Sequence, residues 1–308
     1  MASVKSSTNT PRLAVRGLAG GLLLVALACG PLKQRSPSPR GRPDLPALQR
    51  VTMQSSGVER SFFLAVPNTL PPGPRPLVIV AHGGASEGDS KGRAMAIPWI
   101  DHADEGILYA FPNSAYDSVR PWFGPEDDTP LKDVRFLADI VARVGRKHPV
   151  DPDQVYLGGF SAGAGLAWWV YCNDASRYAG FGMVSAQMAK MLMPTCEPAA
   201  ERPVFYMHGA DDPVIPMSGN ADHDASDATV AWLRERYACA AVPKRDRISG
   251  SSGTAVGATY TCKGPGAVSA WTLRDTGHCW PSVRGRCAGL DGSGLMLDFW
   301  RASAGLPE

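Results

Sequence analysis

The chain has 308 residues, of which 44% are hydrophobic and 19% charged, with a formal net charge of +2. This composition is typical of a soluble globular protein that buries a sizeable core. Residues 1–28 carry three basic residues and no acid, so the remainder has a formal charge of −1. A balance so close to neutral gives no reason to expect nucleic acid or a charged membrane surface as a partner.

The first 29 residues have the pattern of an export signal. A basic stretch ending at Arg16 precedes the apolar run 18–28, which is too short to span a bilayer. The run ends in Leu27-Ala28-Cys29-Gly30, which resembles the lipobox of bacterial lipoproteins, although Ala26 stands where that motif usually has leucine. The resemblance implies an exported cell-envelope protein with a lipid on Cys29 as its only membrane anchor. The alternative is an ordinary cleaved signal peptide and a freely secreted product.

The rest of the chain divides into a tether and one domain. Residues 30–48 are rich in Pro, Arg and Ser without hydrophobic periodicity, which is typical of a linker. From residue 49 to 308 we expect a single catalytic domain, opened by a hairpin over 51–54 and 61–66. Six short apolar runs then predict strands that are buried on both faces: 77–81, 107–111, 155–157, 181–184, 204–207 and 267–273.

Helical patterns lie between these runs. Residues 130–148 place their apolar side chains on one helical face, and Pro149 ends the pattern. Ser226 is expected to cap a helix that runs to residue 237, and residues 295–304 suit a final helix. Strands that alternate with helices predict an α/β domain with a mostly parallel sheet and helices on both faces.

The cysteine count agrees with export. Of seven cysteines, lipidation of Cys29 leaves six, an even set that suits three disulfides in an oxidising compartment. Because no C-x-x-C pair occurs, we expect no zinc site, and nothing else in the sequence indicates a metal or cofactor. Six cysteines allow 15 connectivities. We favour pairing of neighbours: Cys172–Cys196, Cys239–Cys262 and Cys279–Cys287.

A nucleophile motif occurs three times. The pattern G-x-S-x-G can hold a serine on a sharp turn between a strand and a helix, and here it centres on Ser86, Ser90 and Ser161. Ser86 and Ser90 lie in a polar glycine-rich loop. Only Ser161 follows a predicted strand and opens an apolar, helix-like stretch, so we predict it as the nucleophile. The alternative is a buried turn of small residues.

A serine nucleophile needs a histidine base that a carboxylate orients, and in this kind of fold the order along the chain is nucleophile, acid, base. Three histidines follow Ser161. His208 precedes the acidic candidates and is expected to brace a turn, and His223 lies in a polar loop. His278 follows the last predicted strand, so we predict it as the base. Asp211 and Asp212 follow a predicted buried strand, and both are candidates for the acid. Composition alone does not show which of the two carboxylates has this role.

Several ordered motifs between residues 76 and 281 resemble the polyhydroxybutyrate depolymerase and feruloyl esterase group of α/β-hydrolases, which is related to carbohydrate esterase family 1. The matching pieces are 76–84, 133–137, 150–156, 158–163, 208–216 and 277–281. The chain departs from the group at Ala162, where many members have Asn, and at Cys279, where Thr is common.

The resemblance implies the α/β-hydrolase fold and assigns further site residues. It selects Asp212 as the acid, four residues after His208, and places backbone oxyanion donors at Ala162 and Gly84. Aromatic residues near the motifs are candidates for substrate contact, with Trp280 and Trp122 favoured.

The expected function is therefore that of an exported serine esterase acting on carboxylic esters, either feruloyl or acetyl groups on polysaccharide or hydroxyalkanoate oligomers. Two alternatives remain at this point. One is a non-catalytic surface-binding protein on a hydrolase scaffold, and the other is a serine peptidase of related fold.

Overall fold

The computed structural model describes residues 48–70, 72–84, 91–116, 121–122, 130–284 and 287–307. The chain divides into two units, Met1–Pro43 and Asp44–Glu308, and every described residue belongs to the second. The expected signal segment, Cys29 and the serines Ser86 and Ser90 lie outside the described residues.

The described residues form a ten-stranded mixed sheet. Its central strands, from β4 to β10, are parallel, and the strands at both edges are antiparallel. In spatial order the strands are β1 (Gln49–Ser55), β2 (Val58–Ala65), β4 (Leu108–Pro112), β3 (Arg75–Ala81), β5 (Val150–Phe160), β6 (Gly180–Val184), β7 (Val204–Gly209), β10 (Val268–Arg274), β9 (Thr254–Tyr260) and β8 (Lys244–Ser249).

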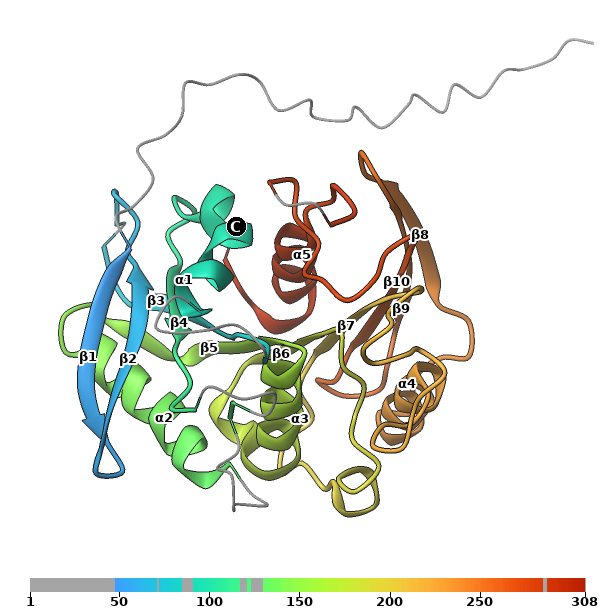
Figure 1. Cartoon of the computed structure of the whole chain (residues 1–308), viewed down its shortest axis with the longest axis horizontal. Coiled ribbons are helices and arrows are strands. Elements are labelled where there is room, and N and C mark those ends of the chain that lie inside the picture. Colours follow the sequence, from blue (N-terminus) through green and yellow to red (C-terminus); the bar gives the residue numbers. More distant parts are fainter. Residues whose placement is uncertain are drawn as a thin grey trace, which may run out of the picture. The chain divides into compact units, whose positions relative to one another are not determined.

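Helices cover both faces of this sheet (Figure 1). One face carries α2 (Leu131–Gly145), α3 (Ala162–Asp174) and α4 (Ser226–Arg236), and the other carries α1 (Lys91–Ala96), η1 (Ile97–His102) and α5 (Gly292–Ala304). Two short 3-10 turns, η2 (Ala175–Arg177) and η3 (Met193–Thr195), follow α3 and β6. The side chains of β3 alternate between the two cores, because successive residues of a strand point to opposite faces.

Each predicted strand is present, and the mostly parallel, two-faced architecture agrees with the expectation. Two strands were not predicted. β8 and β9 form an antiparallel hairpin at one edge, where β8 is largely exposed and carries charged side chains. The role of Ser226 is also corrected. Ala225 is the N-cap of α4, whereas Ser226 is buried at the first helical position with its Oγ 2.7 Å from the Tyr206 hydroxyl.

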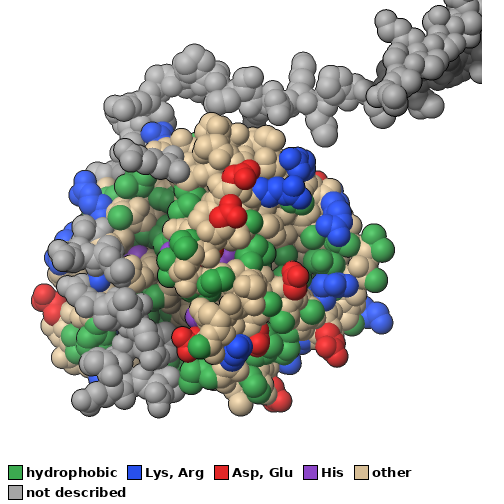
Figure 2. All heavy atoms as spheres, turned by 45° about the vertical axis from the view of Figure 1, so that its right-hand side comes forward, with side chains coloured by type: hydrophobic (Ala, Val, Ile, Leu, Met, Phe, Trp, Pro, Cys, Tyr) green, Lys and Arg blue, Asp and Glu red, His purple; other side chains and the backbone are tan. Residues whose placement is uncertain are grey.

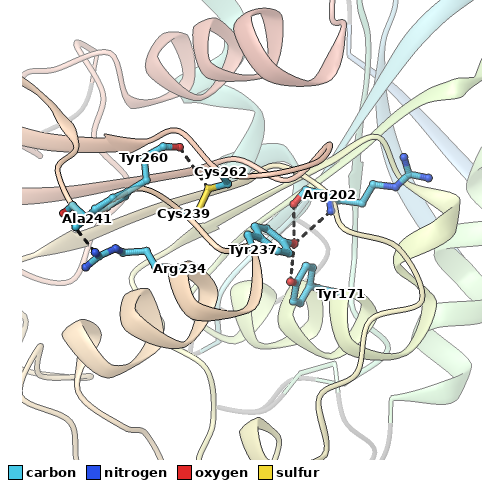
Figure 3. Close-up of a disulfide and its surroundings, with 8 residues drawn as sticks. All are labelled: Tyr171, Arg202, Arg234, Tyr237, Cys239, Ala241, Tyr260 and Cys262. Atoms are coloured by element: carbon cyan, nitrogen blue, oxygen red, sulfur yellow. Dashed lines mark hydrogen bonds between the residues drawn. A yellow bond between two sulfur atoms is a disulfide. The ribbon is translucent and has the colours of Figure 1, made fainter.

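Three disulfides join neighbouring cysteines, in the pairing favoured above: Cys172–Cys196, Cys239–Cys262 and Cys279–Cys287. Figure 3 shows the second of them, which ties the end of α4 to the end of β9. Next to it, Tyr237 donates to the Arg202 carbonyl (2.9 Å) and shares a 2.6 Å hydrogen bond with Tyr171. The disulfide and the tyrosine pair together fasten α4 to the sheet and to α3.

Among the residues that the structure describes, no helix is both long and apolar enough to cross a bilayer.

A buried histidine joins η1 to α5. The Nε2 atom of His102 lies 3.1 Å from both Asp291 carboxylate oxygens, and its Nδ1 atom lies 2.9 Å from Glu105 Oε1. Asp291 also caps α5 by accepting from the Gly294 N–H. Burial by itself lowers the pKa of His102, but the hydrogen bonds and charges of Asp291 and Glu105 outweigh it and raise the pKa from 6.5 to about 10.

This raised pKa predicts a pH-dependent stability. Because the folded-state pKa exceeds the unfolded value, protonated His102 stabilises the fold fully below pH 6.5, and this stabilisation is lost as the pH rises towards about 10. We expect the free energy of unfolding to fall across this window more steeply in the wild type than in His102→Gln, by at least about 1 kcal/mol. Urea unfolding near pH 6 and near pH 9.5 measures the difference. Parallel pH dependences for the two proteins would contradict the assignment.

Candidate active site

Ser161 occupies a strained turn between β5 and α3. Its backbone has φ 52° and ψ −118°, a conformation that residues other than glycine rarely adopt. The flanking glycines allow close backbone approach. A Cβ at Gly159 would lie 2.1 Å from the Gly163 carbonyl oxygen, and a Cβ at Gly163 would lie 2.2 Å from the Ala81 carbonyl oxygen on β3. The motif around Ser161 is therefore required by backbone packing, and it presents the hydroxyl above the end of the sheet.

The three residues predicted as a triad are brought together. His278 Nε2 lies 2.8 Å from Ser161 Oγ, and His278 Nδ1 lies 2.7 Å from Asp212 Oδ2. Each residue follows the carboxyl end of a strand: Ser161 follows β5, Asp212 follows β7 and His278 follows β10. Parallel strands place these ends at one edge of the sheet, where open α/β sheets bind their ligands. This arrangement lets His278 accept the Ser161 proton while Asp212 orients the ring.

Asp212 is buried and held by four donors. Its Oδ1 accepts from the Val214 and Ile215 N–H groups, both at 2.9 Å, and its Oδ2 faces the His278 and His208 rings. Burial by itself raises the pKa of this carboxyl. The hydrogen bonds from His208, His278 and the two backbone N–H groups outweigh it and hold the pKa well below the usual range. Asp212 is therefore an anion at any pH at which the protein is expected to work. The neighbouring Asp211 is exposed.

The loop after β3 is fixed by the side chain of its first residue. His82 Nε2 accepts from the Ser114 N–H (3.1 Å), so Nδ1 carries the ring proton and donates to the Gly83 carbonyl at 2.6 Å. A Cβ added at Gly83 would lie 3.1 Å from Ser161 Cβ, so this loop runs directly beside the serine. Because a trans peptide directs its N–H opposite to its C=O, the Gly84 N–H points away from the His82 ring.

Three contacts hold His278 and its loop. The disulfide Cys279–Cys287 begins at the residue after His278. Ser185, which follows β6 with φ 57°, is fully buried and donates its hydroxyl to the Cys279 carbonyl at 3.4 Å. The Phe160 ring packs against the His278 imidazole with 5.1 Å between ring centroids. Ser185 is not among the predicted site residues, because a lone serine after a strand carries no local signal in the sequence.

The two tryptophans favoured for substrate contact are both buried, and that expectation is corrected. Trp122 is 0% exposed and donates its indole N–H to the His82 carbonyl at 2.7 Å. Trp280 is 8% exposed, packs against Trp99 and donates to Ser293 in α5. Each ring is therefore held within the packing of the domain, Trp122 against His82 and Trp280 against Trp99 and Ser293, and we do not retain either as a substrate-contacting residue.

Histidines of this region are largely covered. His82, His102 and His208 are buried, and histidine side chains show only as small areas on the face of the molecule drawn in Figure 2. The ring of His278 is 14% exposed, whereas the Asp212 side chain is 0% exposed. Among the described residues, no group of His, Cys, Asp and Glu side chains could hold a metal ion.

Comparisons with known proteins find similarity to esterases. Residues 132–229, which include Ser161 and Asp212, match a family described as phospholipase/carboxylesterase. Feruloyl esterase B of Piromyces equi is 24% identical over 218 residues, a match that covers 66% of this chain and only 39% of that protein. The proposed esterase NocK of Nocardia uniformis subsp. tsuyamanensis is 25% identical over 313 residues, covering 86% of this chain and 89% of that protein.

The structure is similar to that of acetyl xylan esterase from Aspergillus awamori. The superposition has a TM-score of 0.58 at 14% identity and covers 82% of this chain and 98% of the other. Likeness at this level of identity establishes the fold. Together with the strand order and the turn after β5, it confirms the α/β-hydrolase fold predicted from the sequence.

Proposed function

We propose that this chain, a feruloyl esterase-like α/β-hydrolase, hydrolyses carboxylic esters through an acyl-enzyme formed on Ser161. The observation that carries the proposal is the continuous row of hydrogen bonds from Asp212 through His278 to Ser161, placed on a strained turn. A protein that only bound its ligand would have no need of this row. The esterase relatives and the phospholipase/carboxylesterase match support the same reaction class.

In the proposed reaction, His278 Nε2 takes the Ser161 hydroxyl proton as Oγ attacks the ester carbonyl carbon. The carbonyl π electrons move to the oxygen. When the tetrahedral intermediate collapses, the bond to the alkoxy group breaks and His278 returns the proton to the departing alcohol. Water then repeats the sequence on the acyl-enzyme, which releases the carboxylic acid and restores Ser161. Asp212 stays ionised throughout and stabilises the imidazolium.

For the oxyanion we propose the backbone N–H groups of Ala162 and Gly84. Ala162 begins α3, and the first N–H groups of a helix have no partner inside it. The Gly84 N–H is aimed by the His82 hydrogen bond to the Gly83 carbonyl, which fixes that peptide plane beside Ser161. Two such donors stabilise the charge that develops on the carbonyl oxygen.

We propose feruloyl or acetyl esters of polysaccharide, or hydroxyalkanoate oligomers, as the substrate class. The similarity to feruloyl esterase B and to the acetyl xylan esterase fold supports the first two. Rates with methyl ferulate, acetylated xylan, 3-hydroxybutyrate oligomers and a peptide p-nitroanilide would rank the candidates. Faster cleavage of the anilide than of every ester would favour a peptidase instead.

A fluorophosphonate probe tests the reaction class directly. The probe should phosphonylate Ser161, the modified peptide should be found by mass spectrometry, and turnover of p-nitrophenyl acetate should stop in proportion to labelling. Absence of turnover on every ester, together with absence of labelling, would overturn the proposal.

We also propose that the protein is exported and lipidated on Cys29. The three disulfides support an oxidising compartment. In bacterial expression, labelled palmitate should enter the wild type and not Cys29→Ser, and only the wild type should sediment with membranes. Release of unlabelled wild-type protein into the medium would indicate an ordinary signal peptide.

A further inference from the structure

A second imidazole lies behind the carboxylate of Asp212. His208, on β7, has a side chain that is 0% exposed, and its Nε2 lies 3.2 Å from Asp212 Oδ2 and 2.8 Å from the Ile215 carbonyl oxygen. From the sequence alone, His208 is expected only to brace a turn. The ring does bind the turn through Ile215, but it also contacts the oxygen that holds His278.

The neighbours of His208 determine where its proton lies. The Ile215 carbonyl and the Asp212 carboxylate can only accept, so Nε2 carries a proton and donates towards both. On the other side of the ring, Nδ1 lies 2.9 Å from the Tyr206 hydroxyl, which lies 2.7 Å from Ser226 Oγ. With a neutral ring, Tyr206 donates to Nδ1 and Ser226 donates to Tyr206. The hydrogen bonds then run in one direction, from α4 through β7 to Asp212.

This network completes the shell of donors around Asp212. A carboxylate offers about four acceptor positions, and Asp212 uses them for Val214, Ile215, His278 and His208. Without the donor at His208, Oδ2 would be held by His278 alone. The two backbone N–H groups would still hold Oδ1, but Oδ2 could shift with the His278 ring, and the aim of that ring at Ser161 would be less sharply fixed.

We propose that His208 is a positioning residue for the reaction, which holds the Asp212 carboxylate so that His278 Nε2 stays aimed at Ser161. The inference rests on the proposed esterase function. His208 touches neither Ser161 nor His278 in the hydrogen bonds described, so its effect must pass through Asp212.

The first test compares two replacements of similar size. His208→Met removes the donor and keeps the volume, and we expect kcat to fall about 10- to 100-fold, as for other partners that orient a functional ligand, with KM within about twofold. His208→Gln can place an amide N–H near the position of Nε2 and should recover most of kcat. Unfolding midpoints show whether each variant is folded. His223→Gln is the matched control and should retain wild-type kcat, because the hydrogen bond of the His223 ring is to Asn220 and not to Asp212, His208 or Tyr206.

A double-mutant cycle decides whether His208 acts through Asp212. In the Asp212→Asn background, His208→Met should cost less than about twofold in kcat, because the carboxylate it positions is already gone. If the fold-losses in kcat of the two single variants multiply in the double variant, the two residues act independently and the proposal is overturned. If His208→Met does not fold, Tyr206→Phe replaces it and should lower kcat severalfold at constant KM; an unchanged kcat would equally overturn the proposal.

The outcomes separate this inference from the proposed function. If the wild type turns over no ester, or Ser161→Ala keeps its activity, the esterase proposal fails. If Ser161→Ala is inactive while folded His208→Met has wild-type kcat, the esterase proposal stands and the role of His208 is rejected.

Discussion

Replacement of Ser161 by alanine is expected to abolish ester hydrolysis, with kcat lower by a factor on the order of 10⁴ to 10⁶. The hydroxyl is the group that becomes acylated, and its Oγ is the atom to which His278 Nε2 is hydrogen-bonded. Alanine retains the Cβ that the backbone at φ 52° already accommodates, so the fold should be unaffected. Steady-state hydrolysis of p-nitrophenyl acetate and thermal unfolding measure the two effects.

The chain contains its own controls for this experiment. Ser86 and Ser90 stand at the centre of the other two G-x-S-x-G patterns, and alanine at either position should leave kcat within about twofold of the wild type. Substantial turnover by Ser161→Ala, or loss of turnover in one of the controls, would show that the nucleophile has been assigned to the wrong motif.

Asp212→Asn is expected to lower kcat by about 10⁴-fold. The Oδ1 position accepts from two backbone N–H groups, so the asparagine oxygen should occupy it and the amide NH₂ should face His278 Nδ1. An NH₂ group cannot accept a hydrogen bond from Nδ1. The ring would then carry its proton on Nε2, and it could no longer take the proton of Ser161.

Asp211→Asn is the matched control for Asp212→Asn. Asp211 precedes Asp212 directly, is exposed, and uses its backbone N–H to bond to the Thr276 carbonyl, so its carboxylate should contribute less than about twofold to kcat. Measuring both variants at several pH values separates loss of the base from a general electrostatic effect. Equal losses for the two variants would mean that negative charge near the site matters more than the Asp212 hydrogen bonds.

Strands could be predicted from the sequence where a continuous apolar run indicates that both faces of the strand are buried. Runs such as 77–81 and 204–207 are continuously apolar because both faces of these strands are covered by helices. The hairpin of β8 and β9 carries no such run. β8 alternates exposed and half-buried residues and exists because β9 pairs with it, while β9 in turn pairs with β10. An edge strand of this kind is stabilised by pairing with a neighbouring strand, and the local sequence pattern of the edge strand does not identify that neighbour.

The residues of the candidate site also differ in how far the sequence could predict them. Ser161 and His278 could be predicted because the glycine pattern and the order of strand ends are local features of the chain. Asp212 was distinguished from Asp211 only by family resemblance, whereas in the structure burial separates them: Asp212 is covered and faces His278, and Asp211 is exposed.

The sequence by itself therefore predicted the fold class, the order of the strands from β1 to β7 and of β10, and Ser161 and His278 as site candidates. Only the tertiary structure decided that Trp122 and Trp280 are buried and that His208 donates to Asp212. The reason is physical. Hydrophobic runs and glycine turns reflect the burial and backbone conformation of neighbouring residues. The partner of a buried ring or carboxylate, in contrast, is set by packing between segments that can be as far apart in the chain as Ser161 and His278, which are 117 residues apart.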